Sequence, residues 1–158
     1  MLFTAFSPAE RTVLTAYAGL SAAGALLGFD ALKELQAMDE LVGVTAGNWL
    51  STALAALGAL LAAIILRESF GRPGVWGACQ AIVSGAVATC LMGIIAGTML
   101  LPVYGTMFGP WLIIVTIIVK PWLMVPWSLT LYGFHKARAE YAAEQDTIYR
   151  YVPKIDAT

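Results

Sequence analysis

One lysine stands where a charge is most costly in this sequence. From Pro73 to Val119 the chain carries no Asp, Glu, Lys, Arg or His, and the first charge after that run is Lys120. A charge inside an apolar, lipid-embedded region is expensive to place and usually serves a purpose. Lys120 is therefore the first candidate for a functional residue.

Three interpretations of Lys120 follow from its neighbours. Pro121 and Pro126 leave two backbone carbonyls without their usual donors, so the ammonium could bond to the carbonyl of Ile117 or to the hydroxyl of Thr116. Because no acidic residue is expected deep in an apolar segment, Lys120 could instead pair with an acid on another subunit or bind an anionic ligand group. In the third interpretation the segment is shifted, and the lysine reaches the membrane interface.

Two tryptophans follow this lysine closely. Trp122 and Trp127 each come after a proline and lie deeper in the apolar segment than an interfacial belt of indoles predicts. Trp122 could face a lipid tail, a pigment, a quinone or a neighbouring subunit. We therefore treat Lys120, Thr116, Trp122 and Trp127 as candidate ligand-binding or partner-binding residues.

The chain lacks the residues that most catalytic chemistry needs. It has a single histidine, His135, so neither a bis-histidine haem site nor a three-histidine zinc site can come from this chain alone. Its two cysteines, Cys79 and Cys90, form no Cys-x-x-Cys motif, and no GxxxxGK[ST] phosphate loop occurs. These features predict no metal, no cofactor and no autonomous enzyme.

The composition is typical of an integral membrane protein. Hydrophobic residues make up 59% of the chain and charged residues 12%, whereas soluble domains average about 25% charged residues. One membrane crossing needs about 20 predominantly apolar residues, so the uncharged run alone has room for two. The net charge of −1 and the absence of a basic stripe predict no nucleic-acid partner.

The sequence predicts an all-α bundle of four transmembrane helices over residues 9–29, 46–66, 75–101 and 110–134. Ser7, Pro8 and Glu10 form a capping box with proline at the first helical position, and the first helix is expected to be retained, not cleaved as a signal peptide. Two prolines are expected to bend the fourth helix. The alternative is two half-segments that meet at Lys120.

Two polar segments border these spans. Residues 30–42 place apolar and charged side chains on opposite faces, which predicts a short amphipathic helix that lies in the interface or docks on the bundle. Residues 135–158 form a polar tail that is compatible with a helix through Glu144 and resembles coil after Asp146. The transmembrane domain is thus predicted over residues 1–134, and the tail is predicted to be cytoplasmic.

Small and polar residues predict how the helices pack. Gly24-x-x-x-Gly28 and Gly93-x-x-x-Gly97 are motifs that allow close helix approach. Polar residues inside the spans can form hydrogen bonds between helices or, alternatively, line a polar path; they are Asn48, Thr52, Gln80, Ser84, Thr89, Thr98 and Thr116.

Basic residues predict the orientation, since short cytoplasmic segments are rich in Lys and Arg. They mark the start of the first span, the second loop and the tail as cytoplasmic, at Arg11, Arg67, Arg72, Lys136 and Arg138. This pattern predicts a bacterial-type inner membrane protein with both termini in the cytoplasm.

Three functional classes remain open from the sequence. The first is a non-catalytic subunit or assembly factor of a larger membrane complex, which would contact lipid and other membrane subunits or copies of itself. The second is a small transporter or channel component that acts as an oligomer. The third, an enzyme acting on lipid or quinone, is disfavoured by the missing catalytic residues.

Overall fold

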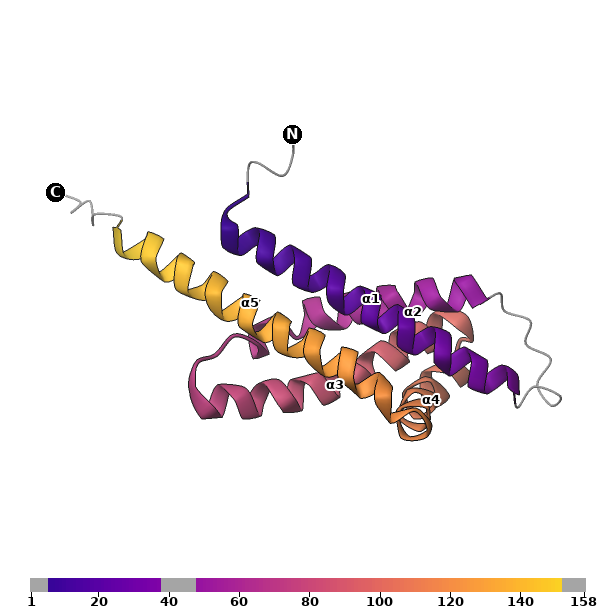
Figure 1. Ribbon diagram of the computed structural model, residues 1–158. Helices are drawn as coiled ribbons and strands as arrows, with labels where there is room; N and C mark the ends of the chain where they lie inside the picture. Colours follow the sequence, from indigo (N-terminus) through magenta and orange to yellow (C-terminus); the bar gives the residue numbers. More distant parts are fainter. Residues whose placement is uncertain (1–5, 38–47, 152–158) are drawn as a thin grey trace.

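The computed structural model describes residues 6–37 and 48–151, and all elements within these ranges are helical. Figure 1 shows the helices packed in one bundle. In chain order the elements are α1 (Pro8–Ala37), α2 (Asn48–Ile65), the 3-10 helix η2 (Arg67–Ser69), α3 (Gly74–Leu100), α4 (Tyr104–Val119), the 3-10 helix η3 (Pro121–Leu123) and α5 (Met124–Tyr151).

Two of these helices, α1 and α3, are long and apolar enough to cross a membrane. α4 and α5 pass the same test only as a pair, which is bent by 106°. α2 is apolar but shorter, and its 18 residues reach roughly 27 Å, just under the hydrocarbon thickness of about 30 Å. The described helices thus include two or three candidate crossings, fewer than the four that the sequence predicts.

α1 runs past the end of the predicted first span. It continues to Ala37, so residues 30–37 prolong the first helix and do not form a separate amphipathic helix. The remainder of that predicted helix, residues 38–42, lies outside the described residues. α1 continues through these residues because no Gly or Pro follows Phe29 to end the helix, although the sequence becomes more polar there.

The predicted start of α1 is confirmed. The Ser7 hydroxyl accepts a hydrogen bond from the Glu10 N–H at 3.2 Å, and the Glu10 carboxylate accepts one from the Ser7 N–H at 2.8 Å. This reciprocal capping box satisfies two backbone donors at the helix start.

α4 begins at Tyr104, six residues before the predicted start of the fourth span at Pro110. It follows a very tight turn in which Val103 has φ 73° and ψ −63° and the Tyr104 N–H donates to the Pro102 carbonyl at 3.0 Å. This is a γ-turn, a strained backbone conformation for a β-branched residue. Residues 104–109, which lie between the predicted third and fourth spans, are helical and pack directly against α3.

The predicted fourth span is broken at Lys120, which has non-helical angles of φ −124° and ψ 72°. Pro121 causes the break, because it has no N–H to donate and disfavours the helical conformation of the residue before it. The alternative of two half-segments is therefore correct, and the single bent helix is wrong. α5 then continues through Phe134 to Tyr151, so residues 147–151 are helical where coil was expected.

Glycines bring α3 and α4 into backbone contact. A Cβ added to Gly97 would overlap the carbonyl oxygen of Gly105, and a Cβ added to Gly109 would overlap that of Gly93. Two Gly-x-x-x-Gly motifs thus face each other across this helix pair. Only the motif on α3 was recognised in the sequence.

α1 and α2 approach each other in a related way. A Cβ on Gly24 would overlap the Cβ of Ala59, and a Cβ on Gly28 would overlap that of Ala55. Each glycine of α1 is therefore covered by an alanine of α2, at the same spacing of four residues.

One end of the bundle brings together the start of α1, the α2–α3 connection and the polar part of α5. The Ser7 hydroxyl donates to the Glu144 carboxylate at 3.0 Å, and the Gly71 N–H donates to Nδ1 of His135 at 3.1 Å. The lone histidine is thus an acceptor that holds a loop against α5.

An aromatic cluster supports the same end. The fully buried Phe134 ring makes edge contacts with Tyr17 of α1 and Phe70 of the α2–α3 connection, at centroid distances of 4.8 and 5.2 Å. Such pairs stabilise by about 0.5–1.5 kcal/mol beyond area burial.

Two glycines provide a matched test of this packing. We expect Gly97→Ala to destabilise the protein by about 1–3 kcal/mol, because the new methyl meets the backbone of α4. Gly133→Ala, also within a helix, meets no atom within 4 Å and should be neutral or stabilising by up to about 1 kcal/mol. Thermal unfolding in detergent, followed by circular dichroism, measures both, and equal effects would contradict the close α3–α4 packing.

Candidate functional site at the α4–α5 break

Lys120 lies between two carboxylates of α1. Its Nζ is 2.9 Å from Oε1 of Glu34 and 3.0 Å from Oδ1 of Asp30. The two acids are four residues apart and so share one face of the helix. All three side chains are partly accessible, with exposed fractions of 27% for Lys120, 12% for Asp30 and 24% for Glu34.

The expectation that no acid of this chain could pair with Lys120 is wrong. It assigned Asp30 and Glu34 to a separate amphipathic helix, whereas both belong to the continuous α1. The ammonium pairs with these two carboxylates, and the Thr116 hydroxyl donates to the Leu112 carbonyl at 2.8 Å. The lysine is instead satisfied by charges far away in the sequence.

The ion pairs lie toward the far end of α1. Asp30 is roughly 33 Å along the helix axis from Pro8, about the thickness of a hydrocarbon core. No charge occurs between Thr12 and Phe29. If α1 crosses a membrane, Lys120 therefore lies near the far boundary of its apolar stretch and not at the centre of the bilayer.

The other predicted site residues are split between the interior and the surface. Thr116 is completely buried, and its carbonyl accepts the Lys120 N–H at 2.8 Å, which ends α4. Trp127 is also buried, and its indole N–H donates to the Thr89 hydroxyl at 2.9 Å. Trp122 is 54% exposed. Lys120 and Trp122 thus remain accessible at the break, while Thr116 and Trp127 belong to the packed core.

Two of the polar residues inside the predicted spans form hydrogen bonds between helices. Thr89 joins α3 to α5 through Trp127, and Thr98 joins α3 to α4 through the Thr106 hydroxyl at 2.7 Å. For these two residues the prediction of interhelical hydrogen bonds is confirmed. The sequence gives no signal that selects Trp127 or Thr106 as the partner, because that choice depends on the relative rotation of the helices.

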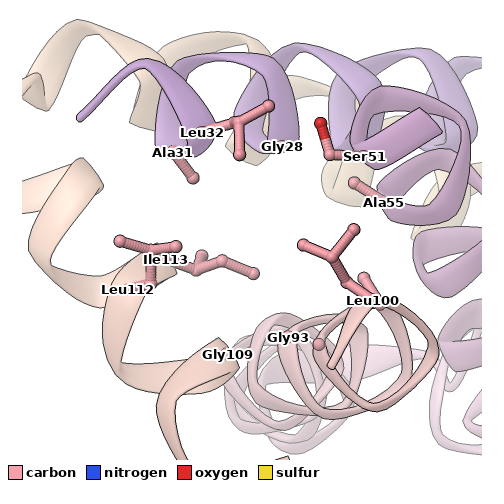
Figure 2. A pocket seen from close by; sticks show the side chains of 12 residues that line it. Gly28, Ala31, Leu32, Ser51, Ala55, Gly93, Leu100, Gly109, Leu112 and Ile113 are labelled. Carbon is pink, nitrogen blue, oxygen red and sulfur yellow. The ribbon is translucent and has the colours of Figure 1, made fainter. Parts of the chain in front are cut away.

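A small cavity lies where α1, α2, α3 and α4 meet, with a volume of about 70 Å³. Figure 2 shows it between Ala31 and Leu32 on one side and Leu100 and Ile113 on the other. Among the described residues that line it, Ser51 has the only polar side chain. Ligand pockets usually measure about 300–1,000 Å³, so this cavity is too small for a quinone or a pigment.

Comparisons with known proteins do not assign this chain to a family. No family model, curated protein or solved structure matches it. Within residues 6–37 and 48–151, no group of three or more His, Cys, Asp or Glu residues could hold a metal ion. The site is therefore interpreted from its own geometry.

The charge cluster can be tested by removing charges in balanced and unbalanced ways. Lys120→Met leaves two adjacent carboxylates without their cation, and we expect it to lower the unfolding midpoint in detergent. The triple variant Asp30→Asn, Glu34→Gln, Lys120→Met removes all three charges of the ion pairs and should recover most of that loss. A triple variant less stable than Lys120→Met would show that the ion pairs are not the source of the effect.

The two tryptophans after the break should respond differently to substitution. Trp127→Phe removes the indole donor to Thr89 and should destabilise by about 0.5–1.5 kcal/mol from the hydrogen bond alone. Trp122→Phe changes a half-exposed side chain and should leave the unfolding midpoint nearly unchanged. Chemical unfolding of both variants in detergent compares them, and the reverse order would refute this assignment of core and surface.

Proposed function

We propose that this chain is a small multi-pass membrane protein that acts as a non-catalytic subunit or assembly factor of a larger membrane complex. The observation that carries the proposal is the contrast between a tightly packed interior and an extensive apolar exterior. The cavity among α1–α4 has room for little more than water, while large apolar side chains are exposed on α3, α4 and α5. They include Trp76, Ile82, Met107, Trp111, Ile118, Leu129 and Tyr132.

The polar end of α5 supports this role. Glu144 is tied to Ser7 at the start of α1, and the helix continues beyond this contact to Tyr151 (Figure 1). A helix that leaves the bundle in this way offers a surface to a partner outside the membrane.

We place four crossings at α1, α2, α3 and the α4–α5 pair, with both termini on the cytoplasmic side of a bacterial-type inner membrane. Basic residues support this orientation, because the contacts of Ser7 with Glu144 and of Gly71 with His135 gather at one end the segments that carry Arg11, Arg67, Arg72, Lys136 and Arg138. Trp49 and Trp76 support the positions of the crossings, since both residues are more than 80% exposed near helix ends, where membrane interfaces attract indoles.

In this proposal the α4–α5 break is the contact point for a partner within the membrane. Lys120 and Trp122 are accessible there, beside the partly accessible carboxylates of Asp30 and Glu34 and close to Lys33 on the same turn of α1. A polar or charged side chain of a neighbouring subunit would contact these accessible charges. Thr116 and Trp127 would act indirectly, by positioning the ends of the two helices.

A second candidate function is a transporter or channel component, and the broken helix favours it. Transporters often place charged residues where a helix is discontinuous, because the unwound backbone and the side chains together bind the solute. The break at Lys120 with its two acids has this arrangement. A path through the protein would then have to form between copies of the chain.

Purification in a gentle detergent, followed by native mass determination, separates the two functions. The subunit proposal predicts a foreign membrane protein in fixed stoichiometry that persists through a second purification step and is weakened by Lys120→Met but not by Val119→Met, a neutral control next to it. A homo-oligomer that conducts ions or protons in liposomes would support the transporter function instead. A monomer without partners would refute both.

A further inference from the structure

A groove lies between α1 and α5, away from the α4–α5 break. It has a volume of about 490 Å³ and is lined by Arg11, Thr12, Thr15, Ala16, Gly19, Thr130, Gly133 and Ala137. The two helices run side by side along it (Figure 1). The groove is thus several times larger than the cavity among α1–α4.

The floor of the groove is more apolar than its residue types suggest. The hydroxyls of Thr12, Thr15 and Thr130 donate to backbone carbonyls within their own helices, at 2.8–3.0 Å. The methyl group of Thr130 faces Gly19, where an added Cβ would lie 3.7 Å from it. The hydroxyls are therefore engaged by the backbone, and the groove favours a hydrocarbon over a polar solute.

Gly133 is not needed for packing within this chain. A Cβ at this position would meet no atom within 4 Å, in contrast to the glycines between α3 and α4. The glycine leaves the groove open, and its place is free for a molecule from outside.

Arg11 lies at one end of the groove. Arg11 is exposed there and is the last charge before the uncharged stretch of α1 from Thr12 to Phe29. A guanidinium has five N–H donors, and the structure places the Nε donor of Arg11 on the Phe6 carbonyl at 3.2 Å. The nearby carboxylates of Glu10 and Glu144 accept hydrogen bonds from Ser7.

We infer that this groove binds an anionic phospholipid, with one acyl chain along the floor and the headgroup phosphate at Arg11. The arrangement of Arg11 and the apolar floor matches the headgroup and acyl chain of such a lipid. Arg11 lies at the boundary of the apolar stretch of α1, and the apolar floor of the groove begins next to it. Basic pockets between transmembrane helices on the cytoplasmic side bind anionic headgroups in this way. The inference requires that α1 crosses a membrane, but it holds for either of the proposed functions.

Native mass spectrometry of the full chain, titrated with phosphatidylglycerol or phosphatidylcholine, tests the inference. We expect one phosphatidylglycerol to bind roughly tenfold more tightly than phosphatidylcholine, which has no net charge. Arg11→Gln should abolish that preference. Lys136→Gln removes the same charge from an exposed residue of α5 outside the groove and should retain it.

The acyl chain is tested separately. Gly133→Leu fills the groove and should lower the affinity for both lipids, while Ser128→Leu, at an exposed position of α5 outside the groove, should not. The unfolding midpoints of both variants show whether they remain folded. If Gly133→Leu does not fold, the smaller Gly133→Ala change replaces it.

Equal losses of lipid preference in Arg11→Gln and Lys136→Gln would overturn the inference in favour of general charge attraction. Unchanged lipid binding in Gly133→Leu would overturn the inference and indicate that the groove holds no lipid. Loss of a dimer in Gly133→Leu would overturn it and indicate that a second copy of the chain occupies the groove.

Discussion

The direction of the chain changes at Lys120, and the ion pairs of this lysine with Asp30 and Glu34 fix the break against the far end of α1. Pro121 makes a continuous helix unfavourable, but it does not determine where the two resulting helices lie. The two carboxylates tie the junction of the two helices to α1, because a lysine in largely apolar surroundings is stabilised by opposite charge. The junction of α4 and α5, where the chain bends by 106°, is therefore held by charges that come from the first helix of the chain.

Close backbone packing explains why so little space remains inside. The four glycines between α3 and α4, and the glycine–alanine contacts between α1 and α2, bring the described parts of these helices so near that the cavity where they meet measures only about 70 Å³. In lipid, where the hydrophobic effect does not drive helix association, such contacts are a main source of stability. Recognition is consequently expected on the outside: at the break, along the groove between α1 and α5, and on the end of α5.

Local signals made some features predictable, and distant contacts made others unpredictable. The helical class, the capping box at Ser7 and the bounds of α3 follow from propensity, caps and the uncharged run. The continuity of α1 past Phe29 was missed because polarity was used as a boundary where no helix-breaking residue occurs. The pairing of Lys120 with Asp30 could not be derived, since it joins residues 90 positions apart. The early start of α4 was hidden because Gly105 and Gly109 resemble loop residues until α3 packs against them.

The most direct test of this account is intramolecular cross-linking in native membranes. With Cys79 and Cys90 replaced by serine, a Glu34→Cys, Lys120→Cys protein is treated with a short bifunctional thiol reagent. A Thr12→Cys, Lys120→Cys protein serves as the control, because Thr12 lies near the opposite end of α1. The account predicts an internal cross-link in the first protein and none in the second. No cross-link with Glu34, or one formed only between separate chains, would contradict the claim that the charge of Lys120 is satisfied within this chain.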